Sequence, residues 1–469
     1  MPGRIDLEFT LGTSTGARQQ AKPLGERMRI LVIGDFSGRG SRGIADAASI
    51  ASRPILRVDI DTFDATLRAL GPALAGLDAS VGETLAFDSL DDFHPDRLLA
   101  RVPAFERLRA AVAEDQGSLL EGLMGGGQAQ KTTPAPATGS VVDNLIRHIV
   151  QPHVQSGPTA ASLAADSALD AGRTELLRGL LHAPHFQQLE AHWRGLRRFV
   201  EAVDLGDEVE LHLLDATKAE LEADRETAGG DPGASALCRR LSQARLAGIA
   251  RPWTLVVGHF RLAASAADLV LLHHLGAVAA EAGGPVLLDA EPGLAGCEPL
   301  GVRTDWRDLS IADEAVREGF AALRRSPVAG WIGLALPRVL LRLPYGRRTD
   351  AIDSFAFDET GATHAHEGLL WGSAALACAQ CIAQAFIEQG DALELADAID
   401  VDDLPAYVRD QDGEKRLQAC AEYPLPVQAG ESLLQRGFIP LLSYGNRAAA
   451  RIAGLQSIAE PRRGLAGLG

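Results

Sequence analysis

Apolar residues in the first quarter of the chain follow the two periods that are typical of strands and helices. Short apolar runs with partial alternation predict strands, and stretches in which apolar residues recur every three or four positions predict helices. The glycine-rich sequence at 34–40, directly after the first run, predicts a strand that ends in a loop. These elements predict a small α/β unit over residues 1–115, a size at which a domain can fold alone. The predicted strands cover 29–33, 55–60 and 84–93, and the predicted helices cover 62–70 and 97–112.

A change in composition separates this unit from the rest of the chain. Glycine, proline, alanine and glutamine are frequent in residues 124–139. Such sequences form flexible or extended linkers rather than packed elements. We therefore predict a linker at 116–140 between two folded regions.

The second and larger region, residues 141–469, alternates helical and strand patterns. This alternation predicts a mainly parallel sheet covered on both faces. The stretch 328–345 contains Pro337 and Pro344, and we predict an irregular extended segment there. The predicted fold class is α/β, with two α/β regions joined by the Gly/Pro-rich linker. Predicted helices of this region cover 141–154, 160–182, 185–203, 264–280 and 370–388, and predicted strands cover 209–214, 253–257 and 285–288.

Composition and charge narrow the class of function. The 469 residues are 46% hydrophobic and 23% charged, which is typical of a soluble globular protein, and the apolar runs are shorter than a membrane span. The first ten residues lack the apolar centre of a signal peptide, so we expect a cytoplasmic protein. A net charge of −17 repels phosphate backbones, which argues against nucleic acid as a partner. The five cysteines are an odd number and predict reduced thiols.

One glycine pattern is a candidate nucleotide site. The sequence from Gly38 to Gly43 matches G-x-G-x-x-G, follows a predicted strand, and precedes Asp59 and Asp61 by about twenty residues. In the dinucleotide fingerprint the first glycine lies at the end of the strand, so that a helix N-terminus meets the pyrophosphate. Here the pattern begins several residues later. A nucleotide-binding enzyme that uses Gly38 to Gly43 is therefore kept as an alternative function.

Other candidate chemistry is weaker. Cys378 and Cys381 have the spacing of half a zinc or redox site, but their flanks are typical of a buried helix, which favours core thiols. His364, His366 and Glu367 lack the helical H-E-x-x-H spacing of a zinc site. The sequence contains neither a Walker phosphate loop nor a G-x-S-x-G elbow. We predict no catalytic residue, no metal and no cofactor.

Residues 182–196, with the sequence HAPHFQQLEAHWRGL, resemble a signature of the large subunit of type VI secretion contractile sheaths, known as TssC, VipB or ImpC. Further blocks that are similar to this family follow in the family's order at 333–346, 354–359, 370–372, and 436–441 together with 455–457. The resemblance implies structural or assembly roles for the matching residues, although helical spacing alone also predicts a packed face for the first block. These residues are Phe186, Leu189, Glu190, Trp193, Arg194, Gly195, Pro337, Arg338, Arg342, Pro344, Tyr345, Trp371, Gly437, Phe438 and Pro440.

The first region is similar to the small sheath subunit, known as TssB, VipA or ImpB, at 30–37, 58–64 and 87–97. The two resemblances together imply a fused sheath subunit that assembles into a tube and contracts to drive protein secretion. They imply self-association or association with other sheath subunits, an inner tube protein and a ClpV-type AAA+ ATPase as partners, and no insertion into a membrane.

Two departures from the family pattern leave a further alternative open. After Phe386 the family's tryptophan- and glycine-rich run is replaced by a different sequence. The chain also stops at Gly469, so we expect most of the family's C-terminal region, which exchanges strands between neighbouring subunits, to be missing. A non-polymerising accessory or cap protein of the same system is the alternative within this class.

Overall fold

The structure is a computed structural model of the chain. It describes residues 27–76, 84–112, 158–246, 251–297, 306, 309–361, 366–390, 400–411, 414–445 and 447–468. The predicted linker at 116–140 and the predicted helix at 141–154 lie outside the described residues. No helix in the described ranges is both long enough and apolar enough to cross a membrane.

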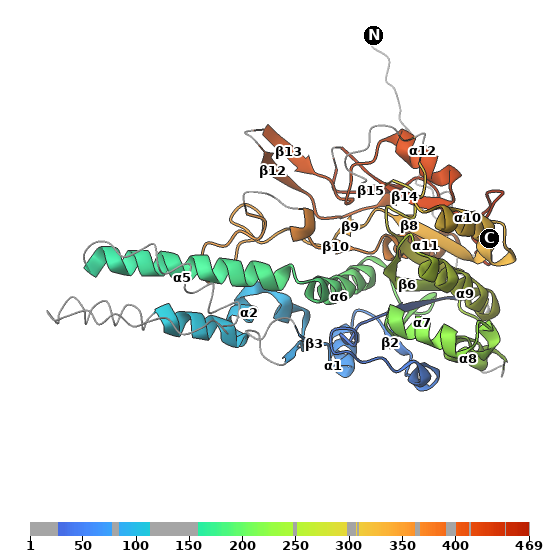
Figure 1. The fold of residues 1–469 in the computed structure, drawn as a ribbon, viewed down its shortest axis with the longest axis horizontal. Coiled ribbons are helices and arrows are strands. Elements are labelled where there is room, and N and C mark those ends of the chain that lie inside the picture. Colours follow the sequence, from blue (N-terminus) through green and yellow to red (C-terminus); the bar gives the residue numbers. More distant parts are fainter. Residues whose placement is uncertain are drawn as a thin grey trace, which may run out of the picture.

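A mixed sheet forms the centre of the molecule, with helices on both faces (Figure 1). Among the described residues it has nine strands in the order β11-β15-β14-β8-β7-β6-β1-β5-β2. The strands from β14 to β5 in this order are parallel, whereas β2, β15 and β11 pair in the antiparallel direction. The prediction of a mainly parallel α/β sheet is confirmed. The strands are β1 Met28–Gly34, β2 Leu56–Val58, β5 Val209–Asp215, β6 Leu255–Leu262, β7 Val286–Ala290, β8 Ile332–Leu336, β11 Asp400–Val401, β14 Phe438–Ser443 and β15 Ala450–Ile452.

Strand β1 lies in the middle of this sheet, although it comes from the first region of the chain. All of its residues pair with β5, and residues 30–33 also pair with β6 on the other side. From its size we had predicted that the unit over residues 1–115 can fold alone; in the structure its first strand is completed on both edges by strands of the second region. Local sequence patterns predict a strand but not its neighbours, which explains the difference.

Alternate residues of β1 enter two different hydrophobic cores, because successive side chains of a strand point to opposite faces. Ile30 and Val32 belong to one core, and Leu31 and Ile33 belong to the other. Burial on both faces explains why β1 is a continuous apolar run. The first core lies under α6 (Pro184–Ala202) and α11 (Ala374–Gln389), and the second under α7 (Lys218–Thr227), α8 (Ala236–Leu246), α9 (Ala266–Ala282), α10 (Glu314–Arg324) and α12 (Val427–Gln435).

One predicted helix of the first region is interrupted at a proline. The predicted helix at 97–112 is divided into α2, Pro95–Arg101, and a second helical stretch at 103–112. Val102 between them is extended, with φ −84° and ψ 119°. Pro103 has no N–H and disfavours a helical residue before it, which accounts for the break. The other elements are α1 Phe63–Leu70, β3 Ala73–Ala75 and β4 Thr84–Ala86, the last much shorter than the strand predicted at 84–93.

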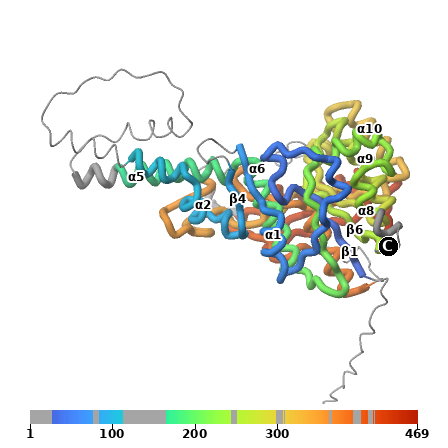
Figure 2. Tube along the Cα trace, turned by 90° about the horizontal axis from the view of Figure 1, so that it is seen from below, coloured from blue at the N-terminus to red at the C-terminus, as the bar shows by residue number. Residues whose placement is uncertain are grey.

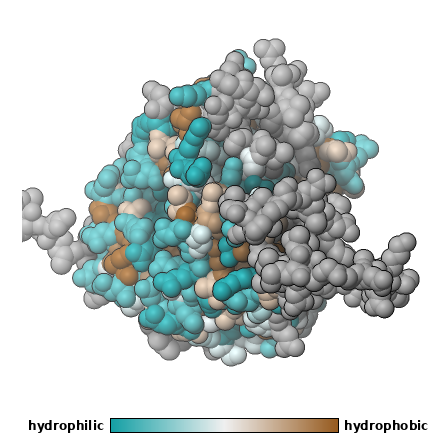
Figure 3. Space-filling model, turned by 90° about the vertical axis from the view of Figure 1, so that its left-hand side faces the viewer, coloured by the Kyte–Doolittle hydropathy of each residue, from teal (hydrophilic) through white to brown (hydrophobic). Residues whose placement is uncertain are grey.

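Helix α5, Pro158–Leu181, extends from the body of the molecule and runs beside the helices of the first region (Figures 1 and 2). A Cβ atom at Gly172 of α5 would lie 2.9 Å from a methyl carbon of Leu108. The absence of a side chain at Gly172 therefore lets these two helices approach closely. Viewed from this end, the coloured surface is mainly hydrophilic, with hydrophobic residues in small scattered groups (Figure 3).

The prediction for residues 328–345 was wrong in its centre. Residues 332–336 form β8, which is buried and lies between β7 and β14. Pro337 follows the last residue of β8, so it ends the strand instead of excluding it. A short strand β9, Val339–Leu340, comes next and pairs with β10, Trp371–Gly372.

Candidate functional site

Helix α6 carries the first family block and joins the two regions of the chain. Trp193 is fully buried, and its Nε1 donates a hydrogen bond of 2.9 Å to the carbonyl oxygen of Phe36. Its ring meets the rings of Phe36 and Phe63 edge-on, with centroids 5.5 and 5.7 Å apart. Both phenylalanines belong to the first region. The helix face that we interpreted as a packed or docking face therefore contacts the first region of the same chain.

About two turns earlier on α6, a second aromatic cluster makes the same connection. Phe186 is fully buried and lies edge-on to Phe87 and Phe93, at 5.9 and 5.6 Å between ring centroids. Phe87 and Phe93 stack on each other at 4.1 Å. Leu189 is buried in the same core. On the opposite side, a Cβ atom at Gly195 would lie 3.3 Å from Leu376 of α11, which shows how closely the two helices approach.

A buried ion-pair cluster connects α6 to the second family block. Arg342 Nε lies 2.9 Å from Glu190 Oε1, and Arg342 Nη1 lies 2.7 Å from Glu359 Oε2. Arg194 Nε also donates to Glu190, at 2.6 Å, and the Arg342 guanidinium lies 4.3 Å from the centre of the Tyr345 ring. Burial alone would raise the pKa of Glu190, but the guanidinium groups of Arg342 and Arg194 lower it below its ordinary value. This carboxylate is held ionised and is fully paired, as a structural group requires.

A second buried pair lies at the turn after β8. Arg338 donates to Glu422 through Nη2 at 2.6 Å and Nε at 3.0 Å, and His366 Nε2 lies 2.9 Å from the same carboxylate. The His366 ring stacks on Trp371 at 5.2 Å. Although burial opposes ionisation, the hydrogen bonds from His366 and Arg338 lower the pKa of Glu422 to about 2. His366, considered earlier as a metal ligand, is engaged in this cluster.

The last family block positions β14. Gly437 has φ +88°, and a Cβ atom there would lie 2.9 Å from the carbonyl oxygen of Ile458, so only glycine fits without strain. Phe438 is buried and stacks on Phe320 at 5.6 Å. Pro440 pairs with Leu336 at the end of the β14–β8 contact. The three predicted residues of this block are thus placed in tight packing or strand pairing within the chain.

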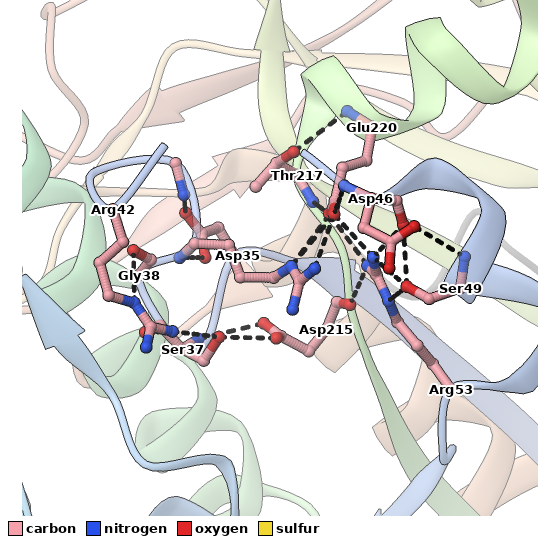
Figure 4. Close-up of polar contacts among 12 residues, drawn as sticks. Asp35, Ser37, Gly38, Arg42, Asp46, Ser49, Arg53, Asp215, Thr217 and Glu220 are labelled. Carbon is pink, nitrogen blue, oxygen red and sulfur yellow. Dashed lines mark hydrogen bonds and ion pairs between the residues drawn. The ribbon is translucent and has the colours of Figure 1, made fainter. Parts of the chain in front are cut away.

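The glycine pattern at Gly38 to Gly43 is held in place by ion pairs (Figure 4). Arg39, inside the pattern, donates to Glu220 at 2.8 Å, and Arg53 donates to the same carboxylate at 2.6 Å. Gly38 has φ +74°, and a Cβ atom there would lie 2.2 Å from the carbonyl oxygen of Ala73. The glycine is therefore required by a close backbone contact within the first region.

In the dinucleotide fingerprint an α-helix begins directly after the glycine pattern. Here the next described element is a 3-10 helix at Ala47–Ser52, and the first α-helix begins only at Phe63. Asp59, considered as a ribose ligand, accepts hydrogen bonds from the backbone N–H and the hydroxyl of Thr62. These contacts favour a structural role for the loop. Sequence reasoning did not identify Glu220, whose only local signal is the capping box with Thr217.

The thiols and the metal candidates have structural explanations as well. All five cysteines are free and buried in the structure, where they pack as core residues. Burial raises the pKa of Cys381 to about 12, so this thiol stays protonated. In the part of the chain that the structure describes, no group of three or more His, Cys, Asp or Glu side chains is placed to hold a metal ion.

Glu220 should make the folded chain sensitive to acid. Burial opposes its ionisation, but hydrogen bonds from Arg53 and Arg39 lower its pKa from 4.5 to about 2. This contribution is present above the ordinary pKa and is lost as the pH falls toward the lowered one; the shift corresponds to about 3 kcal/mol. Glu220→Gln should therefore be less stable than the wild type at about pH 6, and the difference should shrink toward about pH 3. Urea unfolding of both proteins between about pH 3 and pH 6 measures this difference in unfolding free energy. A difference that does not change with pH would contradict the lowered pKa of Glu220.

The fold and these contacts define an α/β protein whose two regions share one sheet. Comparison with known families identifies both regions. Residues 165–459 match the VipB family, described as EvpB/VC_A0108, tail sheath N-terminal domain. Residues 2–114 match the family described as type VI secretion system, VipA, VC_A0107 or Hcp2. The chain belongs to the VipB tail sheath family of type VI secretion systems and carries a VipA-like region before it, which confirms the resemblance drawn from its sequence.

Two curated proteins of Pseudomonas aeruginosa (strain PAO1) are similar to the two regions. The type VI secretion system sheath protein TssC1 is 28% identical over 302 residues, which cover 63% of this chain and 61% of the relative. The type VI secretion system sheath protein TssB1 is 32% identical over 87 residues, which cover 17% of this chain and 49% of the relative. The chain thus spans about three fifths of the first relative and half of the second.

Proposed function

We propose that this chain is a sheath subunit in which a small-subunit region and a large-subunit region form one protomer. The observation that carries the proposal is the position of β1, which comes from the VipA-like region and pairs with β5 and β6 of the VipB-like region. The aromatic contacts of Trp193 and Phe186 across the same boundary support it. The regions 1–115 and 141–469 would then be two parts of one building block rather than two domains that work separately.

The proposed activity is assembly and not chemistry. The carboxylates of Glu190, Glu220 and Glu422 are each paired with arginine. Such pairs fix geometry and leave no poised acid or base at these positions. In a contractile tube, mechanical work is the free-energy difference between two packings of the subunits. The proposed partners are further copies or other sheath subunits, an inner tube protein and a ClpV-type ATPase, in the cytoplasm.

Negative-stain electron microscopy of the purified full chain, with size-exclusion chromatography beside it, tests this function. We expect tubes or rings, either from the chain alone or after addition of the other sheath subunits from the same cell. Particles no larger than a monomer under both conditions would contradict the sheath role and favour the accessory or cap protein. As a control for the enzyme alternative, millimolar NAD or ATP should raise the melting temperature no more than an equal concentration of inorganic pyrophosphate, because a true nucleotide site would also gain affinity from the nucleoside.

A further inference from the structure

Two adjoining hollows lie at the carboxyl ends of the central parallel strands. The larger has a volume of about 380 Å³ and the smaller about 170 Å³, and both are lined by Gln188, Lys218, His259 and Phe260. This position is a topological switch point of the sheet. Strand β5 lies on one side of β1, and β6, the next strand of this sheet along the chain, lies on the other side. In open α/β sheets, ligands bind at such a switch point. The combined size is also in the range of small-molecule sites.

Strand β6 is irregular where it lines this cavity, although the ring of Phe260 also packs in the second core. In a regular strand, neighbouring side chains point to opposite faces. The register between β6 and β7 shifts between Gly258 and Arg261, and His259, Phe260 and Arg261 all line the larger hollow. Bulges of this kind often redirect a side chain beside a functional site. A Cβ atom at Gly258 would lie 2.3 Å from a methyl carbon of Leu288, so close packing against β7 keeps a side chain out of this position.

Arg261 is the cationic group of this cavity that forms no direct ion pair, although its charge acts on the carboxylates of Asp289 and Glu422. Within the described ranges its guanidinium has no carboxylate within 4.0 Å, and its buried Nε has no hydrogen-bond partner. Its pairing neighbour on β7 is Asp289, but Asp289 Oδ1 instead accepts the backbone N–H of Ala375 in the first turn of α11, at 2.8 Å. A partly buried arginine without a carboxylate is poised for an external anion, since its planar fork fits two oxygens of one group.

The other charged groups on the cavity wall are already paired. Lys218 Nζ lies 2.5 Å from Asp268, and Arg338 forms the two-point contact with Glu422. His192 and His259 meet edge-on at 4.1 Å, and burial lowers the pKa of both, so they are neutral. The Lys218 and Arg338 charges are balanced by their own partners, which leaves Arg261 as the specific anchor.

We propose that this cavity binds a small molecule through a phosphate or carboxylate group, with Arg261 as the residue that pairs with its oxygens. Gln187 and Gln188, also on the wall, supply amide groups for the rest of the molecule. The site contains residues of both regions, since Asp35 and Gly40 line the smaller hollow. A bound ligand would therefore touch the VipA-like and VipB-like parts of the protomer together. The inference does not depend on whether the chain forms a tube.

Isothermal titration calorimetry of the full chain tests the site, with inorganic phosphate and citrate as separate probes and ionic strength held constant with sodium chloride. We expect saturable binding of at least one probe, and the stronger one shows whether the natural group is a phosphate or a carboxylate. Arg261→Gln should weaken binding at least about tenfold, as expected when a charged hydrogen-bonding partner is lost. Arg261→Lys, which keeps the charge but not the fork, should give an intermediate affinity.

Arg68→Gln is the matched control, because Arg68 is exposed on α1 outside the cavity. It should bind the probe as the wild type does. The proposal is overturned if neither probe binds above the chloride background, or if Arg261→Gln and Arg68→Gln bind equally well. Because Arg261 has no ion-pair partner among the described residues, its replacement should leave the melting temperature near that of the wild type, and circular dichroism checks this.

Discussion

Replacing Arg342 with methionine should lower the free energy of unfolding by about 3–5 kcal/mol, the typical cost of breaking a buried ion pair. The guanidinium neutralises Glu190 and Glu359, which are 0% and 1% exposed. Methionine fills much of the same space but leaves the buried Glu359 without its arginine and Glu190 with Arg194 alone. The expected shift is measured as the change in the urea midpoint multiplied by the slope of the transition.

Two controls separate the buried charge from the loss of packing. The double variant Arg342→Met with Glu359→Gln should recover part of the lost stability, because it removes one of the stranded charges while the amide oxygen can still accept the Tyr345 N–H. Arg109→Ala, which removes an exposed partner of Glu106, should change stability by less than about 1 kcal/mol. If Arg342→Met costs no more than Arg109→Ala, the cluster does not hold the two family blocks together.

Trp193→Ala should have an effect of similar size, about 3–5 kcal/mol, because it removes a large buried ring and leaves a cavity. The ring fills the space between α6 and the first region, where it contacts Phe36 and Phe63. The loss should appear as a lower midpoint in urea and as easier proteolysis of the first region. If the protease cleaves the variant only within the segment 113–157, Trp193 does not hold the first region against α6.

Trp193→Phe provides the comparison for this prediction. It keeps an aromatic ring in the core but removes the Nε1 donor, so the Phe36 carbonyl loses its hydrogen bond. We expect a cost of about 1–3 kcal/mol, below that of the alanine variant. Equal costs for the two variants would mean that the hydrogen bond, and not the ring, carries the contact.

Elements that bury a continuous set of side chains were predictable from the sequence. Helix α6 was predicted at 185–203 and lies at Pro184–Ala202, and helix α9 was predicted at 264–280 and lies at Ala266–Ala282. Strand β1 was equally clear, because both of its faces are apolar. In each of these elements the periodicity of the apolar residues matches the side chains that are buried in the fold, so tertiary contacts do not change the local preference for helix or strand.

The contacts that make the site were not predictable in the same way. Arg342 was identified through its family block, but its contact with Glu190 joins residues 152 positions apart. Glu220 and Arg39 are 181 positions apart, and no local pattern connects them. The placement of β1 has the same origin, because an apolar run predicts a strand and does not predict which strands lie beside it. Short strands such as β15 lack the length at which a period can be recognised.

Strand β1 leaves the ribosome well before the two strands that pair with it. Strands β5 and β6 end at Asp215 and Leu262, about 180 and 230 residues after Gly34. At about 5–20 residues per second, synthesis of this stretch takes on the order of 10–40 seconds. During that time β1 is an apolar strand with both edges open, which can pair with the wrong chain. Because both regions are translated in one polypeptide, each copy of β1 stays tethered to the strands that complete its sheet, and we expect a nascent chain of this kind to depend on chaperones until β6 has been made.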